Sequence, residues 1–208
     1  MSEDTTAATE EVNERHREKM KKRKAARDKM MASKTEERGL IIVHTGKGKG
    51  KSSAAWGMAL RCLGHGYKIG VVQYIKGRRE TGEHMLFAQF PDLVSHKIMG
   101  EGFTWETQDR ERDIAAATAA WEASKVMMAD PEIRMVILDE LNVALRYEYV
   151  DLDEILDTLA TKRPDLHVVI TGRNAKPELI DMADLVTEMT LVKHPFRDGV
   201  RGQPGVEF

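Results

Sequence analysis

Residues 40–53 read LIIVHTGKGKGKSS, and this short segment carries the clearest structural signal in the chain. The apolar run Leu40–His44 is typical of a short β-strand, and a glycine-rich turn follows it. The next segment, Lys51–Leu63, has the composition of a helix. A strand, a glycine-rich turn and a helix in this order are typical of a loop that binds phosphate groups.

The glycine-rich turn departs from the usual phosphate-loop pattern, G-x-x-x-x-G-K-[ST], by one position. Residues 50–52 match its end, but Thr45 stands where the first glycine is expected and Gly46 comes one residue later. The chemistry survives this shift, because the glycines let backbone N–H groups turn toward phosphate oxygens. We expect Lys51 to supply a cation and the Ser52 hydroxyl to bind Mg²⁺. A glycine-rich hairpin decorated with surface lysines is the alternative.

Strand-like and helix-like segments alternate along the rest of the chain. Strands are expected at 68–74, 94–99, 134–138, 167–171 and 185–189, and helices at 107–129, 152–161 and 177–183. This alternation predicts an α/β fold with three layers, a mostly parallel sheet flanked by helices, similar to P-loop NTPases of the RecA-like type. Ligands of such sheets bind beyond the carboxyl ends of the strands, so the turns that follow 40–44, 134–138 and 167–171 should share one rim.

Asp139 and Glu140 stand directly after the apolar run Met135–Leu138. Phosphate-loop folds place the carboxylate associated with the metal ion at the end of such a strand. We therefore expect Ser52 and one or both of Asp139 and Glu140 to serve the metal. The alternative is that Asp139 only caps a short helix over 142–146. In an ATPase, Glu140 would be the candidate base that activates water.

Charge and composition exclude several classes of protein. The 208 residues hold 32 Lys+Arg against 34 Asp+Glu, a balance that argues against a protein that coats nucleic acid. The single cysteine, Cys62, excludes an intrachain disulfide and suggests a reducing compartment. No apolar run approaches the roughly 20 residues that span a bilayer, and the first residues show no secretory signal. We therefore expect a soluble cytoplasmic protein.

Residues 1–38 differ from the rest of the chain, because they are highly charged and contain no aromatic residue, glycine or proline. We expect a charged N-terminal helical arm at 1–38 and an α/β domain at 39–208. A solvated, frayed helix and an arm that docks over a site or a partner subunit both fit this composition. An arm that binds nucleic acid fits less well, because acidic residues interleave with the basic ones and no ring can stack on a base.

The stretch Gly46–Gly77 closely resembles the ATP:corrinoid adenosyltransferases, also called cob(I)alamin adenosyltransferases. The displaced first glycine is itself a feature of that family. Further blocks match in family order: GFTWET at 102–107, LDELN at 138–142, TGR at 171–173 and VKHPF at 192–196. The resemblance covers about residues 39–208. One departure is Ser52-Ser53 where two threonines are common, and both residue types offer a hydroxyl.

The resemblance implies a transferase that acts in adenosylcobalamin biosynthesis or salvage. Co(I) in a corrin ring attacks the ribose 5′-carbon of ATP, a cobalt–carbon bond forms and triphosphate leaves. The corrinoid itself supplies the nucleophile, so the tasks of the protein are to hold the triphosphate, orient the ribose and help to form Co(I). The family also implies Mg²⁺ or Mn²⁺, a homodimer, and an electron donor such as a flavoprotein for Co(II). It implies neither a nucleic-acid partner nor a membrane.

The resemblance assigns the nucleotide to the loop and to two arginines. These residues are Gly46, Lys47, Gly48, Lys49, Gly50, Lys51, Ser52, Ser53, Arg61 and Arg173. Lys51 and Mg²⁺ would stabilise the charge that develops on the leaving triphosphate. Ordinary surface residues are the alternative for Lys47 and Lys49 and for the two arginines. Glu140 becomes a metal or ligand contact rather than a hydrolytic base, because transfer to water must be avoided.

The resemblance also implies a role for Phe103 and Trp105 in the reduction of Co(II). Co(II) that keeps its lower axial ligand is hard to reduce, and aromatic rings packed on the lower corrin face would expel that ligand and water. Both rings stand in a glycine-rich connection rather than on a periodic element. Packing in the core is the alternative for such a pair.

The sequence is also compatible with two other functions. A P-loop ATPase or small-molecule kinase would release orthophosphate or ADP instead of triphosphate. A nucleotide-gated module with an arm for nucleic acid would bind with steep salt dependence and lose binding when residues 1–38 are deleted. The preferred corrinoid and the identity of the reductant do not follow from the sequence.

Overall fold

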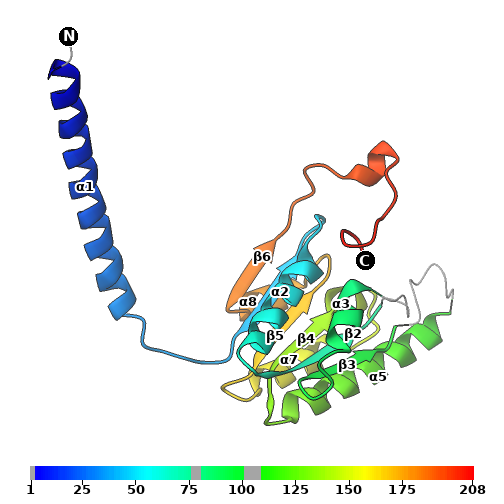
Figure 1. The fold of residues 1–208 in the computed structure, drawn as a ribbon. Coiled ribbons are helices and arrows are strands. Elements are labelled where there is room, and N and C mark those ends of the chain that lie inside the picture. Colours follow the sequence, from blue (N-terminus) through cyan, green and yellow to red (C-terminus); the bar gives the residue numbers. More distant parts are fainter. Residues whose placement is uncertain (1–2, 76–80, 101–108) are drawn as a thin grey trace. The chain divides into compact units, whose positions relative to one another are not determined.

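The computed structural model describes residues 3–75, 81–100 and 109–208 (Figure 1). The chain divides into two compact units, residues 1–37 and 38–208, which are described separately. The first unit contains helix α1 (Glu3–Ala32). Val12, Met30 and Met31 are more than half exposed on it, so the side chains described from residue 10 onward form no buried apolar stripe.

The second unit is built on a six-stranded sheet in which all neighbouring strands are parallel. The strands are β1 (Ile41–Thr45), β2 (Lys68–Gln73), β3 (Val94–Ile98), β4 (Ile133–Asp139), β5 (His167–Thr171) and β6 (Leu185–Glu188). They lie in the order β3-β2-β4-β5-β1-β6. The predicted parallel α/β fold is confirmed, and β5 separates β1 from β4, which carries Asp139.

Helices cover both faces of the sheet. The helices of the second unit are α2 (Lys51–Gly64), α3 (Gly82–Phe87), α5 (Arg110–Ala129), α6 (Leu141–Arg146), α7 (Leu152–Ala160) and α8 (Pro177–Met182), followed by the 3₁₀ turn η1 (Pro195–Asp198). The first two pack on one face, where Trp56 and Phe87 join the strands in a core cluster. The other four pack on the opposite face. None of the described helices has a stretch long and apolar enough to cross a membrane.

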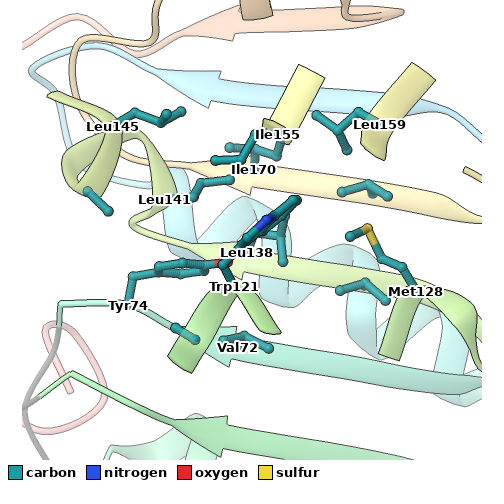
Figure 2. Close-up of a cluster of buried hydrophobic side chains, with 14 of the residues drawn as sticks. Val72, Tyr74, Trp121, Met128, Leu138, Leu141, Leu145, Ile155, Leu159 and Ile170 are labelled. Carbon is teal, nitrogen blue, oxygen red and sulfur yellow. The ribbon is translucent and has the colours of Figure 1, made fainter. Parts of the chain in front are cut away.

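The larger core cluster lies under α5, α6 and α7 (Figure 2). Leu138 and Ile170 from the strands meet Trp121 and Leu145 from these helices, and all four side chains are almost fully buried. The indole Nε1 of Trp121 donates a hydrogen bond of 2.9 Å to Glu154 Oε1 at the edge of the cluster. Buried aromatic rings of this kind keep a polar partner, so the packing fixes α5 against α7.

Cys62 lies in the core between α2 and the sheet, as expected for a residue that packs rather than reacts. Burial raises the pKa of its thiol, which disfavours the reactive thiolate.

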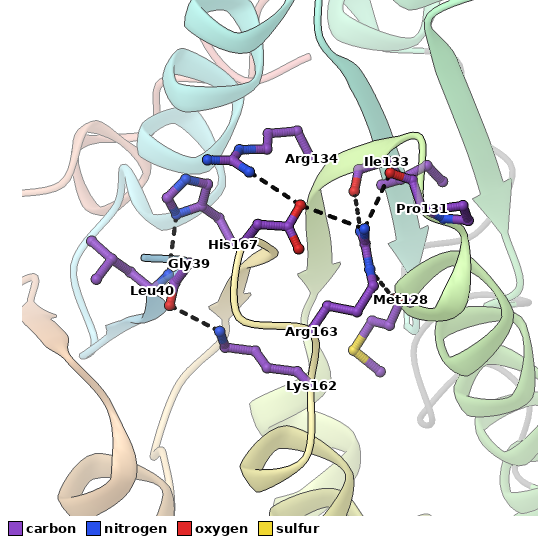
Figure 3. A network of polar contacts seen from close by, with 10 residues as sticks. Gly39, Leu40, Met128, Pro131, Ile133, Arg134, Lys162, Arg163 and His167 are labelled. Carbon is purple, nitrogen blue, oxygen red and sulfur yellow. Dashed lines mark hydrogen bonds and ion pairs between the residues drawn. The ribbon is translucent and has the colours of Figure 1, made fainter. Parts of the chain in front are cut away.

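Polar side chains tie together the amino ends of β1, β4 and β5 (Figure 3). Arg163 donates to the backbone carbonyls of Met128, Pro131 and Ile133. Lys162 Nζ donates to Gly39 O at 2.8 Å. These bonds pair backbone groups at the end of the sheet opposite the phosphate loop. They therefore stabilise the fold and are not part of the candidate site.

Gly57 offers a simple test of helix α2. An added Cβ there would meet no atom within 4 Å, and the residue lies in the middle of the helix. We expect Gly57→Ala to raise the free energy of unfolding by up to about 1 kcal/mol, because alanine loses less backbone entropy in a helix. Urea denaturation measures the change, and a clear loss of stability would contradict the open space seen at this position.

Candidate nucleotide site at the carboxyl ends of the strands

The phosphate loop connects β1 to α2, and its backbone explains the displaced glycine. Thr45 is the last residue of β1, paired with Glu188, so it needs no special conformation. Gly46 has φ 97°, and a Cβ there would lie 2.4 Å from the carbonyl oxygen of Met189. Gly50 also has a positive φ, 104°. The left-handed backbone therefore begins at residue 46, one position later than the usual pattern places it.

Lys51 is buried inside this loop, with 8% of its surface exposed. Its Nζ donates to the carbonyl oxygens of Gly46 at 2.9 Å and Gly48 at 2.6 Å. The Gly48 N–H in turn donates to Met189 O at 2.6 Å. A helix, rather than the second strand of a hairpin, follows the loop. The ammonium group therefore lies at the centre of the loop, and the segment after β6 forms its outer wall.

Asp139 joins the loop to three strands of the sheet. Its carboxylate is fully buried, and its Oδ1 accepts hydrogen bonds from Ser52 Oγ at 2.7 Å and Thr171 Oγ1 at 2.8 Å. Its Oδ2 accepts from Gln73 Nε2 at 3.1 Å. The N-cap of α6 is Glu140 and not Asp139, so the alternative of a simple capping aspartate is wrong.

Glu140 lies beside Asp139 at the rim, in a backbone conformation unusual for its type. Its φ is 65°, its side chain makes no capping hydrogen bond to α6, and its N–H donates to Thr171 Oγ1 at 3.0 Å. Positive φ costs energy in a residue other than glycine and often marks a functional site. The neighbouring Gly172 has φ 128°, and a Cβ there would lie 2.8 Å from Asn142 Cβ and 3.2 Å from Glu140 Oε2, so this turn needs a glycine. The exposed Arg173 follows on the same turn.

The remaining expected residues are spread more widely. Lys47 and Ser53 are exposed at the loop and at the start of α2, and Lys49 forms an ion pair with Glu207. Arg61 lies in the last turn of α2, about 15 Å along the helix axis from Lys51 at 1.5 Å per residue. The structure therefore does not bring Arg61 to the rim, because α2 runs away from it.

Two expected residues, Phe103 and Trp105, lie outside the described residues. Gly100, just before them, packs against the end of β2, where an added Cβ would be 2.5 Å from the Ile75 carbonyl carbon.

Sequence reasoning missed Gln73, Thr171 and Met189 as parts of the site. Gln73 and Thr171 are polar residues that end apolar strands, and their place at the carboxyl edge is the signal that could have found them. Met189 gave no such signal, because it contributes backbone groups to the wall of the loop.

A cavity of about 530 Å³ opens on the other face of the sheet, between α5 and the turn from α6 to α7. Its lining includes Trp121, Tyr149 and Glu154 but no residue of 46–53 or 139–142. The hydrogen-bonded loop and carboxylate, rather than this cavity, therefore define the candidate site.

Buried histidines predict how stability depends on pH. Burial lowers the pKa of His96 from 6.5 to about 4, with help from His84 and opposed by Asp139. Burial likewise lowers the pKa of His44 and His167. The unfolded chain binds a proton at His96 more readily than the folded chain does. The contribution of His96 to the free energy of unfolding is therefore complete above pH 6.5 and is lost as the pH falls toward 4. Urea unfolding across this range should show a shallower loss for His96→Phe than for the wild type, and parallel profiles would contradict the assignment.

Comparisons with known proteins agree with the geometry of the site. Residues 37–208 match the family model described as ATP:corrinoid adenosyltransferase BtuR/CobO/CobP. Residues 1–31 match the model described as cob(I)alamin adenosyltransferase N terminal.

Full-length relatives carry the same description. The chain is 54% identical to a corrinoid adenosyltransferase of Pseudomonas aeruginosa, over 95% of this chain and 98% of the relative. It is 55% identical to a corrinoid adenosyltransferase of Sinorhizobium sp, over 100% of both chains. It is 45% identical to the corrinoid adenosyltransferase CobA of Salmonella typhimurium, over 94% of this chain and 99% of the relative. The resemblance noted in the sequence is confirmed, and the chain belongs to the ATP:corrinoid adenosyltransferase family.

Proposed function

We propose that this protein transfers the 5′-deoxyadenosyl group of ATP to the Co(I) of a reduced corrinoid and releases triphosphate. Family membership over residues 37–208 is the observation that carries the proposal. Relatives that match almost end to end share one description, corrinoid adenosyltransferase, so an ATPase or a small-molecule kinase is not favoured. The product would serve adenosylcobalamin biosynthesis or salvage.

The loop supplies what the leaving triphosphate needs. Lys51 Nζ already lies between the carbonyl oxygens of Gly46 and Gly48, and phosphate oxygens would compete with them for its protons. The N-terminus of α2 adds backbone N–H groups and its positive dipole end. These groups stabilise the negative charge that grows as the bond from the ribose to the triphosphate breaks.

Ser52 and Asp139 fit a divalent metal ion bound to ATP. Their atoms are a hydroxyl and a carboxylate 2.7 Å apart, and Mg²⁺ or Mn²⁺ binds such oxygen ligands. Among the described residues no group of three or more His, Cys, Asp or Glu could hold a metal, which fits an ion that takes its other ligands from phosphate and water. Such an ion would supply Lewis-acid stabilisation of the triphosphate. Glu140 would contact the metal or the nucleotide from the rim.

The same carboxylate is poorly suited to activate water. Asp139 is fully buried, and its oxygens already accept hydrogen bonds from Ser52, Thr171 and Gln73, so they are engaged before any water could be activated. Cobalt of the corrinoid is the nucleophile in the proposed reaction, and the protein needs no base for it. Hydrolysis of ATP would be a side reaction that this arrangement suppresses.

One experiment tests the proposed function directly. The protein is mixed with ATP, Mg²⁺ and chemically reduced corrinoid, and the absorption bands of a light-sensitive alkylcobalt product are followed. We expect these bands together with one triphosphate per product. Release of orthophosphate or ADP, without change in the corrinoid spectrum, would instead indicate an ATPase or a kinase.

Phe103 and Trp105 belong to the proposal as the residues that help to form Co(I). We expect the double change Phe103→Ala with Trp105→Ala to lower transfer strongly when Co(II) and a mild reductant are supplied. The loss should be much smaller with Co(I) prepared chemically, because the rings then have no ligand to expel. Rates from the two assays decide the matter: equal losses would mean that the rings only support the fold.

The proposal also covers the oligomeric state, the redox partner and the cellular compartment. We infer a homodimer, an electron donor such as a flavoprotein, and a cytoplasmic setting in which Cys62 stays reduced. We also propose that residues 1–38 form a charged helical arm that is a separate unit from the α/β domain at 39–208. Light scattering and mixing with a reduced flavoprotein test the first two inferences.

A further inference from the structure

Gln73 holds the second carboxylate oxygen of Asp139, and His96 in turn holds Gln73. Gln73, at the end of β2, lies opposite Asp139 in the sheet register, and its Nε2 donates to Asp139 Oδ2 at 3.1 Å. Its Oε1 lies 3.2 Å from Nε2 of His96 on β3. A hydrogen-bonded row therefore crosses three neighbouring strands and ends at the carboxylate that bonds Ser52.

Chemistry fixes the direction of every bond in this row. An ionised carboxylate only accepts hydrogen bonds, so Gln73 must present its NH₂ group to Asp139. Its carbonyl then faces His96, whose Nε2 must carry the proton. A half-turn of the Gln73 amide would place its oxygen against the carboxylate, and His96 opposes that turn by donating to Oε1.

The surroundings of His96 keep its ring in place. The ring centroid lies 6.5 Å from Trp56 on α2, and 6.2 Å from Phe87 and 5.0 Å from His84 on α3. Gln73 is itself 7% exposed, so its amide has few other partners. Among the titratable groups that face this ring, His84 comes from α3 and Asp139 from β4. A buried amide held at both ends is a rigid support.

We propose that Gln73 and His96 are positioning residues, which hold Asp139 so that its other oxygen faces Ser52 and the metal ion of bound ATP. The inference rests on the proposed function for the identity of the metal–nucleotide complex. Without these residues, Asp139 Oδ2 would be buried with fewer donors and the carboxylate would turn more freely. Outer partners of a ligand commonly change metal affinity by about 10–100-fold when they are removed.

The test measures binding of ATP at increasing Mg²⁺, by calorimetry and without corrinoid. Gln73→Met removes both hydrogen bonds at nearly constant volume, and His96→Phe keeps a ring among its aromatic neighbours but removes the donor. We expect each to raise the Mg²⁺ concentration for half-saturation by about tenfold. ATP binding without metal should stay as in the wild type. His96→Gln restores a donor and should recover most of the affinity.

Controls separate positioning from folding. Gln89→Met changes an exposed glutamine just after α3 and should leave the Mg²⁺ dependence unchanged. Wild-type half-saturation in both Gln73→Met and His96→Phe overturns the inference. Equal weakening of ATP binding with and without Mg²⁺ also overturns it, because the residues would then only hold the fold. The readout needs no corrinoid, so it is independent of whether adenosyl transfer itself is observed.

Discussion

Lys51→Ala is expected to lower kcat/KM for ATP by at least about 100-fold, as when a donor to developing negative charge is removed. Lys51 is the buried cation of the loop, with its Nζ held by two carbonyl oxygens at 2.6 and 2.9 Å. A charge in such a water-poor site acts more strongly than a surface charge. Transfer to chemically prepared Co(I) at varied ATP measures the loss without involving the reduction step.

Removal of this ammonium also leaves the carbonyl groups of Gly46 and Gly48 without their donor. Lys51→Met keeps the apolar part of the side chain and separates loss of charge from collapse of the loop. Lys97→Met, which changes an exposed lysine on β3, is the matched control and should behave as the wild type. Normal turnover of both Lys51 variants would refute the assignment of the phosphate loop.

Gly46→Ala should have the second largest effect. A side chain at φ 97° is strained, and its Cβ would lie 2.4 Å from Met189 O and 2.7 Å from Met189 N. These are backbone atoms, so relief requires the segment after β6 to move. We expect ATP binding to fall below detection and the free energy of unfolding to drop by about 2 kcal/mol or more.

The contrast with Gly57→Ala makes the prediction specific. Both changes add one methyl group within or next to the loop–helix unit, yet one should destabilise the protein and the other should stabilise it. Urea unfolding and ATP titration of the two variants provide the comparison. If Gly46→Ala bound ATP as tightly as the wild type, the prediction would be wrong, because the backbone at Met189 could then move aside at little cost in free energy.

Much of the fold follows from local patterns in the sequence. The apolar runs that became β1, β4 and β5 were short and bounded by turns, and the glycine-rich loop fixed the direction of the chain after β1. Helix α3 escaped prediction, and α6 was expected only as the short helix over 142–146 in the alternative for Asp139, because six residues leave little periodic pattern.

The site was only partly predictable, because its contacts join distant segments. Ser52 and Asp139 were expected to serve one metal and do share a hydrogen bond. The resemblance assigned Arg61 to the nucleotide, whereas the rise of helix α2 carries this residue away from the loop. The support from Gln73 depends on β2 lying beside β4, and strand order cannot be read from a single sequence.

The order of strands also bears on how the enzyme is made. β1 is the first strand to leave the ribosome, but its two neighbours in the sheet, β5 and β6, are the last two strands synthesised. Strands β2, β3 and β4 can pair while the nascent chain is still growing, whereas β1 must wait for segments more than a hundred residues downstream. Closing such long loops is slow. The phosphate loop should therefore take its shape only after β5 and β6 have been synthesised.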